Sequence, residues 1–284
     1  MKINLDSMQG NQKGKTVSLA NGVQMPLIGL GVYKSKEGAE VENAVLSALE
    51  NGYRLIDTAS FYGNEAGVGR AVHTSGMDRD TIFISTKLWN SDQGYHNAIE
   101  AFNRSLDKLK MDYVDLYLVH WPVENKYLET WPAIEEIYKT GRAKAIGVSN
   151  FHVHHLEKLK AVASISPMVN QVEFHPFLQQ KPLQDYCRSN KIQYESWSPI
   201  MRGRVLEIEL LKKLAIKYDK SAVQIVIRWN YQKSIVCIPK SVKPARIKSN
   251  IDIFDFEIDE SDMLLIDQLD RNERTGPDPD NFDF

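Results

Sequence analysis

The chain has 284 residues, of which 43% are hydrophobic and 25% are charged, a composition typical of soluble globular proteins. Its formal net charge of −2 and its pI near 6.4 give no electrostatic reason to expect nucleic acid or an anionic membrane as a partner. No apolar run approaches the roughly 20 residues that span a bilayer, and residues 1–15 lack the apolar stretch of a secretory signal. We therefore expect a cytoplasmic protein, and a monomer because no exposed apolar stripe is evident. Cys187 and Cys237 are expected to be buried free thiols, although the sequence also allows one disulfide.

The first elements in chain order are a loose arm and a hairpin. Residues 1–15 are polar and rich in glycine, glutamine and asparagine, which predicts a flexible arm before a single domain over residues 16–284. Asn21 and Gly22 then lie between two alternating runs, the strongest short-range signal for a tight β-hairpin. Such a hairpin, placed before the first barrel strand, could close the N-terminal end of a barrel.

From residue 27 onward, strand-like and helix-like stretches alternate. The strand-like stretches are rich in β-branched and aromatic residues, and they cover residues 27–31, 54–58, 82–87, 113–120, 145–150, 169–174, 193–199 and 235–240. Apolar residues recur at helical spacing in residues 39–52, 95–110 and 127–141, and again near the C-terminus in 245–251 and 261–270. Strands separated by helices imply a parallel sheet, and eight such strands can close on themselves. We predict an α/β fold, a (β/α)8 TIM barrel with an N-terminal β-hairpin and extra C-terminal helices.

Four polar residues lie where three successive predicted strands end. Asp57, Lys87 and His120 lie at the ends of the second, third and fourth strands, and Tyr62 lies in the loop after the second. Loops at the carboxyl ends of barrel strands converge on one mouth, so these four side chains should meet. A phenol has a pKa of about 10, and a neighbouring ammonium makes it a better acid. The set therefore predicts a proton donor for a carbonyl oxygen whose carbon receives a hydride, although each residue taken alone could be structural.

Residues 238–250 form a second candidate site, with four cations and no acid. They follow the eighth predicted strand and lead into a helix, which is where barrel enzymes commonly hold phosphate. Lys240, Ser241 and Arg246 are suited to grip it, and two charge-assisted hydrogen bonds would favour a 2′-phosphorylated nucleotide by about a hundredfold. The alternative interpretation is a solvated basic face of a helix.

Polar and aromatic groups after the remaining strands suit a nicotinamide and a substrate. Ser149, Asn150 and Gln171 could bind the carboxamide, and Trp197, followed by Ser198, offers a flat face for the ring. Three aromatic residues near other strand ends could line a substrate pocket or simply pack at the rim: Tyr33, Trp89 and Trp121.

The chain has no Rossmann fingerprint. The glycine pair Gly67 and Gly69 lacks the third glycine of that motif and is better suited to let a helix pack closely. A bound dinucleotide would therefore have to lie extended across the barrel mouth.

Taken together, these residues resemble the aldo-keto reductase family over nearly the whole chain, from about residue 17 to the end. The motifs that carry the resemblance are LIGLGVY, GYRLIDTASFYGNEAGVGRA, ISTKLW, YVDLYLVHWP, GRAKAIGVSNF, NQVEFHP and IPKSVKPARIKSN. The tail GPDPDNFDF is similar to that of the bacterial branch with 2,5-diketo-gluconate, glyoxal and methylglyoxal reductases.

The resemblance implies NADPH-dependent reduction of aldehydes and some ketones, without a metal, with small carbonyls or 2-oxoaldehydes as substrates. It implies that Tyr62 is the general acid, that Lys87 and Asp57 tune it, and that His120 orients the carbonyl. It further implies two cofactor sets: Ser149, Asn150 and Gln171 for the carboxamide, and Lys240, Ser241, Arg246 and Asn250 for the 2′-phosphate end.

The chain departs from the family pattern at three places. The ring-stacking position, often tyrosine, is Trp197, and the residue before Asn250 is Ser249 where many relatives have Glu or Gln. These departures leave cofactor affinity open. The tail is short beside those of animal relatives, which predicts an open pocket with loose selectivity.

Three other functions compete with the reductase. A metal-dependent hydrolase would need converging histidines, but the pair His152 and His154 opens a predicted helix and is expected to be exposed surface. A Schiff-base aldolase would use Lys87. A barrel that binds NADPH as a sensor or accessory subunit would keep the fold and cofactor site with little turnover.

Overall fold

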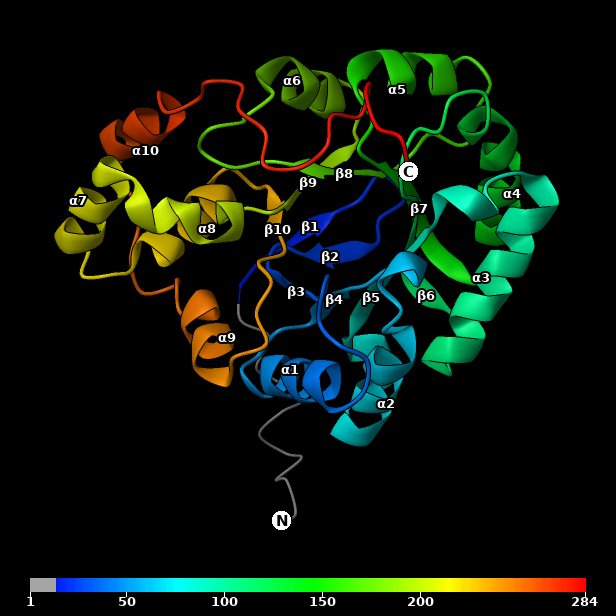
Figure 1. Cartoon of the computed structure of the whole chain (residues 1–284), viewed down its shortest axis with the longest axis horizontal. Coiled ribbons are helices and arrows are strands. Elements are labelled where there is room, and N and C mark those ends of the chain that lie inside the picture. The colour runs from blue at the N-terminus through cyan, green and yellow to red at the C-terminus, as the bar shows by residue number, and fades with distance from the viewer. Residues whose placement is uncertain (1–13) are drawn as a thin grey trace.

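A parallel sheet of eight strands forms the centre of the molecule in the computed structural model, which describes residues 14–284 (Figure 1). The strands follow one another in chain order around the sheet: β3 Gly29–Gly31, β4 Leu55–Asp57, β5 Phe83–Leu88, β6 Val114–Val119, β7 Ala143–Ser149, β8 Val169–Glu173, β9 Gln193–Trp197 and β10 Val236–Cys237. Parallel bridges from Ile28 to Cys237 and from Gly31 to Lys240 join the two edges. The sheet is therefore closed, and the predicted barrel is confirmed.

Helices surround this barrel (Figure 1). They are α1 Ala39–Glu50, α2 Glu65–Ser75, α3 Tyr95–Leu109, α4 Tyr127–Lys139, α5 Val153–Lys160, α6 Lys181–Ser189, α7 Glu209–Lys217, α8 Ala222–Gln232, α9 Pro244–Ile251 and α10 Glu260–Asp267. Most of them turn an apolar stripe to the barrel, as the helical spacing of apolar residues in the sequence requires, whereas α7 and α10 pack on neighbouring helices. None of the helices within residues 14–284 is long and apolar enough to cross a membrane.

The predicted hairpin is present. Strands β1 Thr16–Ser18 and β2 Gln24–Pro26 pair antiparallel, and Gly22 in the turn has a φ of 88°, which favours glycine. The Asn21 amide donates to the carbonyl of Lys144, at the start of β7, over 2.8 Å. The hairpin thus lies at the N-terminal end of the barrel, opposite the mouth. Most of the predicted arm, residues 1–13, lies outside the described residues.

Two glycines on α2 allow close helix packing, as the sequence predicted. A Cβ atom on Gly69 would lie 2.1 Å from the carbonyl oxygen of Leu109, and one on Gly67 would lie 2.4 Å from Val41. Both distances are far below van der Waals contact, so any side chain would push α2 away from α3 or α1. The expected free thiols are also confirmed, since Cys187 and Cys237 are buried and unpaired.

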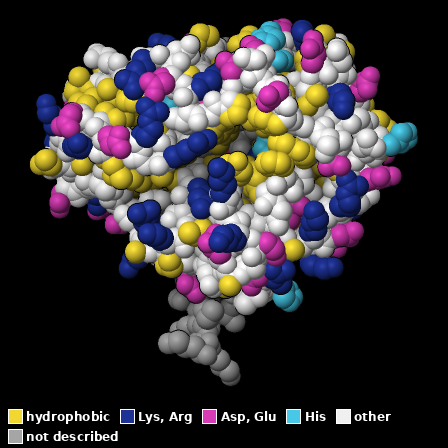
Figure 2. All heavy atoms as spheres, viewed as in Figure 1, with side chains coloured by type: hydrophobic (Ala, Val, Ile, Leu, Met, Phe, Trp, Pro, Cys, Tyr) yellow, Lys and Arg dark blue, Asp and Glu magenta, His cyan; other side chains and the backbone are white. Residues whose placement is uncertain are grey.

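The C-terminal segment crosses the barrel rather than extending away from it. After α10 it runs past β9 and β8 and ends near β7 and α5 (Figure 1). On the same face, hydrophobic side chains gather around a hollow near the middle, with lysine and arginine side chains beside it (Figure 2). The chain end therefore lies where the strands end.

Candidate active site

A buried ion pair lies beneath the barrel mouth. The Lys87 ammonium donates to both oxygens of Asp57, over 2.6 and 2.8 Å, and to the Thr58 carbonyl over 2.8 Å. The two charged side chains are only 0% and 3% exposed. The Tyr62 hydroxyl lies 3.4 Å from the Lys87 nitrogen. The structure thus brings three of the four predicted catalytic residues into direct contact.

The position of Tyr62 follows from local structure. Strand β4 ends at Asp57, and a short 3-10 turn, Ser60–Tyr62, returns the chain over the end of β5. The Ser60 hydroxyl donates to the Lys87 carbonyl over 2.9 Å and fixes this turn. Tyr62 is therefore held over the Lys87 ammonium by a bonded turn rather than by a free loop.

Burial has the largest single effect on the pKa of Tyr62 and on that of Lys87. Burial raises the pKa of the Tyr62 hydroxyl to about 12, although Lys87 acts to lower it. Burial lowers the pKa of the Lys87 ammonium, but Asp57 and Tyr62 together raise it above its ordinary value. Lys87 therefore stays charged and Tyr62 stays protonated at neutral pH. The ammonium limits the rise in the pKa of Tyr62 and does not bring it below that of a free phenol.

His120 completes the group from the end of β6. Its ring centroid lies 5.8 Å from that of Tyr62, and its Nδ1 atom has no hydrogen-bond partner among the described residues. Burial, and then the nearby Lys87 charge, lower the pKa of His120 well below its usual 6.5. A neutral imidazole results, which can donate a hydrogen bond to a substrate oxygen without competing with Tyr62 for protons.

The residues predicted for a nicotinamide lie together at the ends of β7, β8 and β9. The Ser149 hydroxyl donates to the Gln171 carbonyl over 2.8 Å, and the Trp197 indole N–H donates to the Asn150 side-chain oxygen over 2.8 Å. The Gln171 amide nitrogen donates to Asp57 over 2.9 Å. These polar atoms are satisfied internally, so binding of a carboxamide would exchange existing hydrogen bonds. The assignment of these residues to a cofactor stays a prediction.

The chain matches a known protein family over most of its length. Residues 27–271 match the model of the Aldo/keto reductase family. The chain belongs to this family. It is 54% identical over 269 residues to the glyoxal reductase of Bacillus subtilis (strain 168), an alignment that covers 95% of this chain and 98% of the relative. It is 46% identical over 270 residues to the methylglyoxal reductase DkgA of Escherichia coli (strain K12), with 94% and 97% covered.

A solved structure confirms the likeness of the fold. A mutant of Gox0644 in complex with NADPH has a TM-score of 0.91 to this aldo/keto reductase, with 42% sequence identity. The match covers 95% of this chain and 99% of that one.

The basic segment of this aldo/keto reductase lies after β10. Arg246 is exposed on the first turns of α9, Lys240 is partly buried, and Ser241 and Asn250 are buried. None of the ion pairs of residues 14–284 involves a cation of this segment. Cations without carboxylate partners at the start of a helix favour phosphate binding over the alternative of a solvated basic face, because the helix N-terminus also attracts negative charge. Their role in binding phosphate stays a prediction.

The predicted pocket aromatics differ in their surroundings. The rings of Tyr33 and Tyr62 are 4.9 Å apart, and those of Trp89 and His120 are 5.1 Å apart. Trp121 is buried and contacts the chain end, where the Phe284 ring lies 5.2 Å away. The C-terminal residues reach the mouth and pack on Trp121, whereas Tyr33 is exposed, so the openness and selectivity of the pocket stay predictions.

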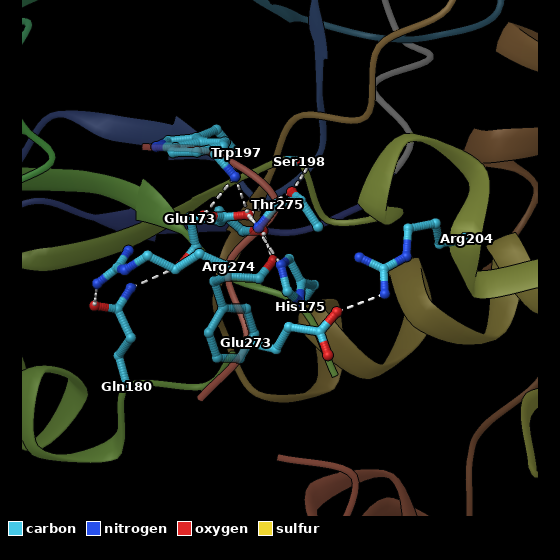
Figure 3. Close-up of polar contacts among 12 residues, drawn as sticks. Glu173, His175, Gln180, Trp197, Ser198, Arg204, Glu273, Arg274 and Thr275 are labelled. Atoms are coloured by element: carbon cyan, nitrogen blue, oxygen red, sulfur yellow. Dashed lines mark hydrogen bonds and ion pairs between the residues drawn. The ribbon is translucent and has the colours of Figure 1, made fainter. Parts of the chain in front are cut away.

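The tail begins at a buried carboxylate that the sequence did not single out as an anchor. Glu173, at the end of β8, accepts hydrogen bonds from the backbone N–H and hydroxyl of Thr275, from the Gly276 N–H and from His175 (Figure 3). Burial raises the pKa of Glu173, but these hydrogen bonds lower it below its ordinary value. A Cβ atom on Gly276 would lie 2.5 Å from the Trp197 ring. The start of the tail is thus packed against the predicted stacking residue.

Glu195 is a second residue that sequence reasoning missed. It lies on β9, paired in register with Gln171, and it is 0% exposed. Neither of its carboxyl oxygens has a well-formed hydrogen bond among the described residues, although the Gln171 amide is near. Burial, and then Asp57, raise the pKa of Glu195 to about 8. The sequence feature that could have identified Glu195 is the presence of an acidic residue in the middle of a predicted strand.

The pair His152 and His154 is not simple exposed surface, as the sequence had suggested. His154 is exposed, but His152 is partly buried and His155 is buried. All three approach Asp280 of the C-terminal tail.

Proposed function

We propose that this aldo/keto reductase reduces aldehydes and some ketones to alcohols with NADPH, and that Tyr62 is the general acid. The observation that carries the proposal is the contact of the Tyr62 hydroxyl with the buried Lys87–Asp57 pair, beside a neutral His120. The naming of similar proteins as glyoxal and methylglyoxal reductases supports small carbonyls or 2-oxoaldehydes as substrates.

Each side chain of the site has a role that follows from its charge state. When bound, NADPH supplies a hydride to the carbonyl carbon. The neutral His120 imidazole holds the carbonyl oxygen by donating a hydrogen bond to it. Tyr62 then gives its proton to that oxygen as negative charge develops there, which yields the alcohol. Lys87 stabilises the tyrosinate left behind, and Asp57 keeps the ammonium in place until a proton returns to Tyr62.

Two features support NADPH as the cofactor. Lys240, Ser241 and Arg246 follow β10, and the two cations lack carboxylate partners in residues 14–284, so they are free to bind the 2′-phosphate, with Asn250 beside the adenosine. The Trp197 ring is fixed by its hydrogen bond to Asn150, which suits it to hold a nicotinamide ring. The NADPH complex of the similar protein Gox0644 agrees with this assignment.

We further infer that the protein acts as a monomer in the cytoplasm and binds no nucleic acid. The net charge of −2 supports the absence of nucleic acid, and the two buried free thiols support a reducing compartment such as the cytoplasm.

The test is NADPH oxidation, followed by its absorbance, with methylglyoxal and a panel of small aldehydes. Loss of the general acid in Tyr62→Phe should lower kcat by about 10²–10⁴-fold, while NADPH binding, followed by protein fluorescence, persists. Tyr113→Phe is a matched control, because Tyr113 precedes β6 at the opposite end of the barrel. Full turnover by Tyr62→Phe would show that another group donates the proton.

The second candidate, an NADPH-binding sensor or accessory barrel, is separated by the same assay. A sensor would bind NADPH in the wild type without oxidising it in the presence of any carbonyl of the panel.

A further inference from the structure

Three histidines at the start of α5 surround one carboxylate of the C-terminal tail. His152 Nδ1 lies 3.0 Å from one oxygen of Asp280, while His154 Nε2 and His155 Nε2 lie 3.0 and 3.4 Å from the other. The four ligand atoms all lie within 4.8 Å of one another. Asp280 is separated from α5 by more than a hundred residues of chain, so this cluster joins the tail to the barrel wall.

In two of these imidazoles, the ring nitrogen that points away from Asp280 has a hydrogen-bond donor beside it, and this contact determines which nitrogen carries the proton. His155 Nδ1 accepts the backbone N–H of His152 over 3.1 Å, so its proton is on Nε2, which lies 3.1 Å from His154 Nε2 and 3.4 Å from Asp280. His152 Nε2 lies 2.8 Å from a guanidinium nitrogen of Arg274, which is always a donor. The proton of His152 is therefore on Nδ1, which also faces Asp280.

These tautomers distinguish a carboxylate clamp from a metal site. The spacing of the four ligand atoms would suit a metal such as Zn²⁺, which binds imidazole nitrogen and carboxylate oxygen. However, a histidine that binds a metal normally donates its other N–H to an acceptor. His152 and His155 instead face donors on that side, so a metal would have to break both hydrogen bonds. Of the three imidazoles, His152 is hydrogen-bonded to Asp280 through Nδ1, whereas His154 Nε2 and His155 Nε2 lie 3.1 Å apart and are hydrogen-bonded to each other beside the carboxylate.

Asp280 is followed directly by residues that reach the predicted substrate pocket. Phe282 and Phe284 lie 5.1 and 5.2 Å from the Trp121 ring, and Phe284 stacks on Trp89 at 5.8 Å with 4° between the ring planes. The Asn90 amide donates to the carbonyl of Phe284 over 3.0 Å. The aromatic chain end therefore forms a wall next to Trp89, which itself contacts His120.

The tail has a second and independent anchor upstream. Glu173 holds Thr275 and Gly276, and Arg274 also reaches Gln180 on the barrel side (Figure 3). Loss of the Asp280 contacts would therefore leave the beginning of the tail in place. Only the last few residues, which carry Phe282 and Phe284, would be released.

We propose that His152, His154 and His155 are positioning residues for the substrate, which hold Asp280 and thereby keep Phe282 and Phe284 as a wall of the carbonyl pocket. The proposal rests on the reductase function proposed above for its consequences on substrate binding. Its structural part, the attachment of the tail, stands independently of turnover. Bulky aromatic carbonyls depend on this wall, whereas methylglyoxal is too small to reach it from His120.

The experiment compares Asp280→Ala with Asp283→Ala, a matched change in the same tail, because the Asp283 side chain has no partner among the described residues. In Asp280→Ala, hydrogen exchange of the Asn281 amide, which donates to the Asp278 carbonyl over 3.0 Å, should become at least about tenfold faster. The KM for an aromatic aldehyde should rise about fivefold, as expected for one lost aromatic contact. kcat, the KM for methylglyoxal and NADPH binding should stay within about twofold, and Asp280→Glu should restore part of the loss.

Three kinds of outcome overturn the proposal, and a fourth concerns the reductase function. Unchanged exchange in Asp280→Ala would mean that the histidines do not hold the tail. Faster exchange with an unchanged aromatic KM would mean that the tail is held but does not shape the pocket, as would an equal KM change in Asp283→Ala. Stoichiometric Zn²⁺ binding that Asp280→Ala abolishes would make the cluster a metal site. Absence of turnover in the wild type would refute the reductase function, and the exchange measurement would still decide whether the tail is held.

Discussion

Glu195 makes the stability of this protein depend on pH in a way that one substitution can isolate. The side chain is fully buried within the barrel, near Asp57, and burial raises its pKa from 4.5 to about 8. A carboxyl group with a raised pKa binds its proton more tightly in the folded state, so the unfolded chain releases that proton first as pH rises. Its contribution to stability is therefore complete below pH 4.5 and is lost progressively up to about pH 8.

The size of this effect follows from the two pKa values. They differ by about 3.5 pH units, and one unit corresponds to about 1.4 kcal/mol. Between pH 5 and pH 8, the wild type should therefore lose about 3 kcal/mol of unfolding free energy as Glu195 ionises next to Asp57. Glu195→Gln keeps the shape and polarity of the side chain but cannot ionise. The variant should lack this part of the pH dependence, whatever its absolute stability.

Urea unfolding of the wild type and of Glu195→Gln at pH 5 and pH 8 measures the difference. The free-energy gap between the two proteins should shift by about 3 kcal/mol in favour of Glu195→Gln at pH 8. Glu207→Gln is the control, since Glu207 is exposed and should show no such shift. A gap that does not change with pH would refute the reasoning, because Glu195 would then ionise alike in the folded and unfolded chain.

Three further substitutions test the site and the packing. Lys87→Met leaves Asp57 buried without its cation, so it should cost about 3–5 kcal/mol of stability and abolish turnover, while Lys87→Met with Asp57→Asn should recover stability in urea unfolding but not activity. Arg246→Ala should raise the KM for NADPH about 10–100-fold in steady-state assays and leave that for NADH unchanged, because only NADPH carries the 2′-phosphate. Gly69→Ala should destabilise the protein by about 1–3 kcal/mol in the same unfolding assay, since its Cβ would lie 2.1 Å from the Leu109 carbonyl oxygen, and a variant as stable as the wild type would contradict this packing.

Much of the barrel was predictable from local pattern. Runs of β-branched and aromatic residues marked all eight strands, and the spacing of apolar residues marked α1, α3 and α4 between them and α9 and α10 after them, but not α6, α7 or α8. Asn21 and Gly22 located the hairpin, because few other residues adopt its turn. The meeting of Asp57 with Lys87 was also predictable, since each ends a strand of the same parallel barrel.

Other features depended on the environment that folding creates. The sequence suggested that Lys87 would make Tyr62 a stronger acid, but burial raises its pKa to about 12. The roles of Glu195 and Asp280 could not be read from their neighbours in the chain. Glu195 depends on the exclusion of water from the barrel, and Asp280 on the return of the tail to α5.

The sequence by itself thus determined the order of strands and helices and the identity of the groups at each strand end, because propensity and periodicity act over a few neighbouring residues. Only the tertiary structure decided which groups are ionised and what encloses the mouth. Desolvation and the contact of Asp280 with three histidines arise between residues that are distant in the chain, and they exist only once the barrel has closed and the tail has packed across it.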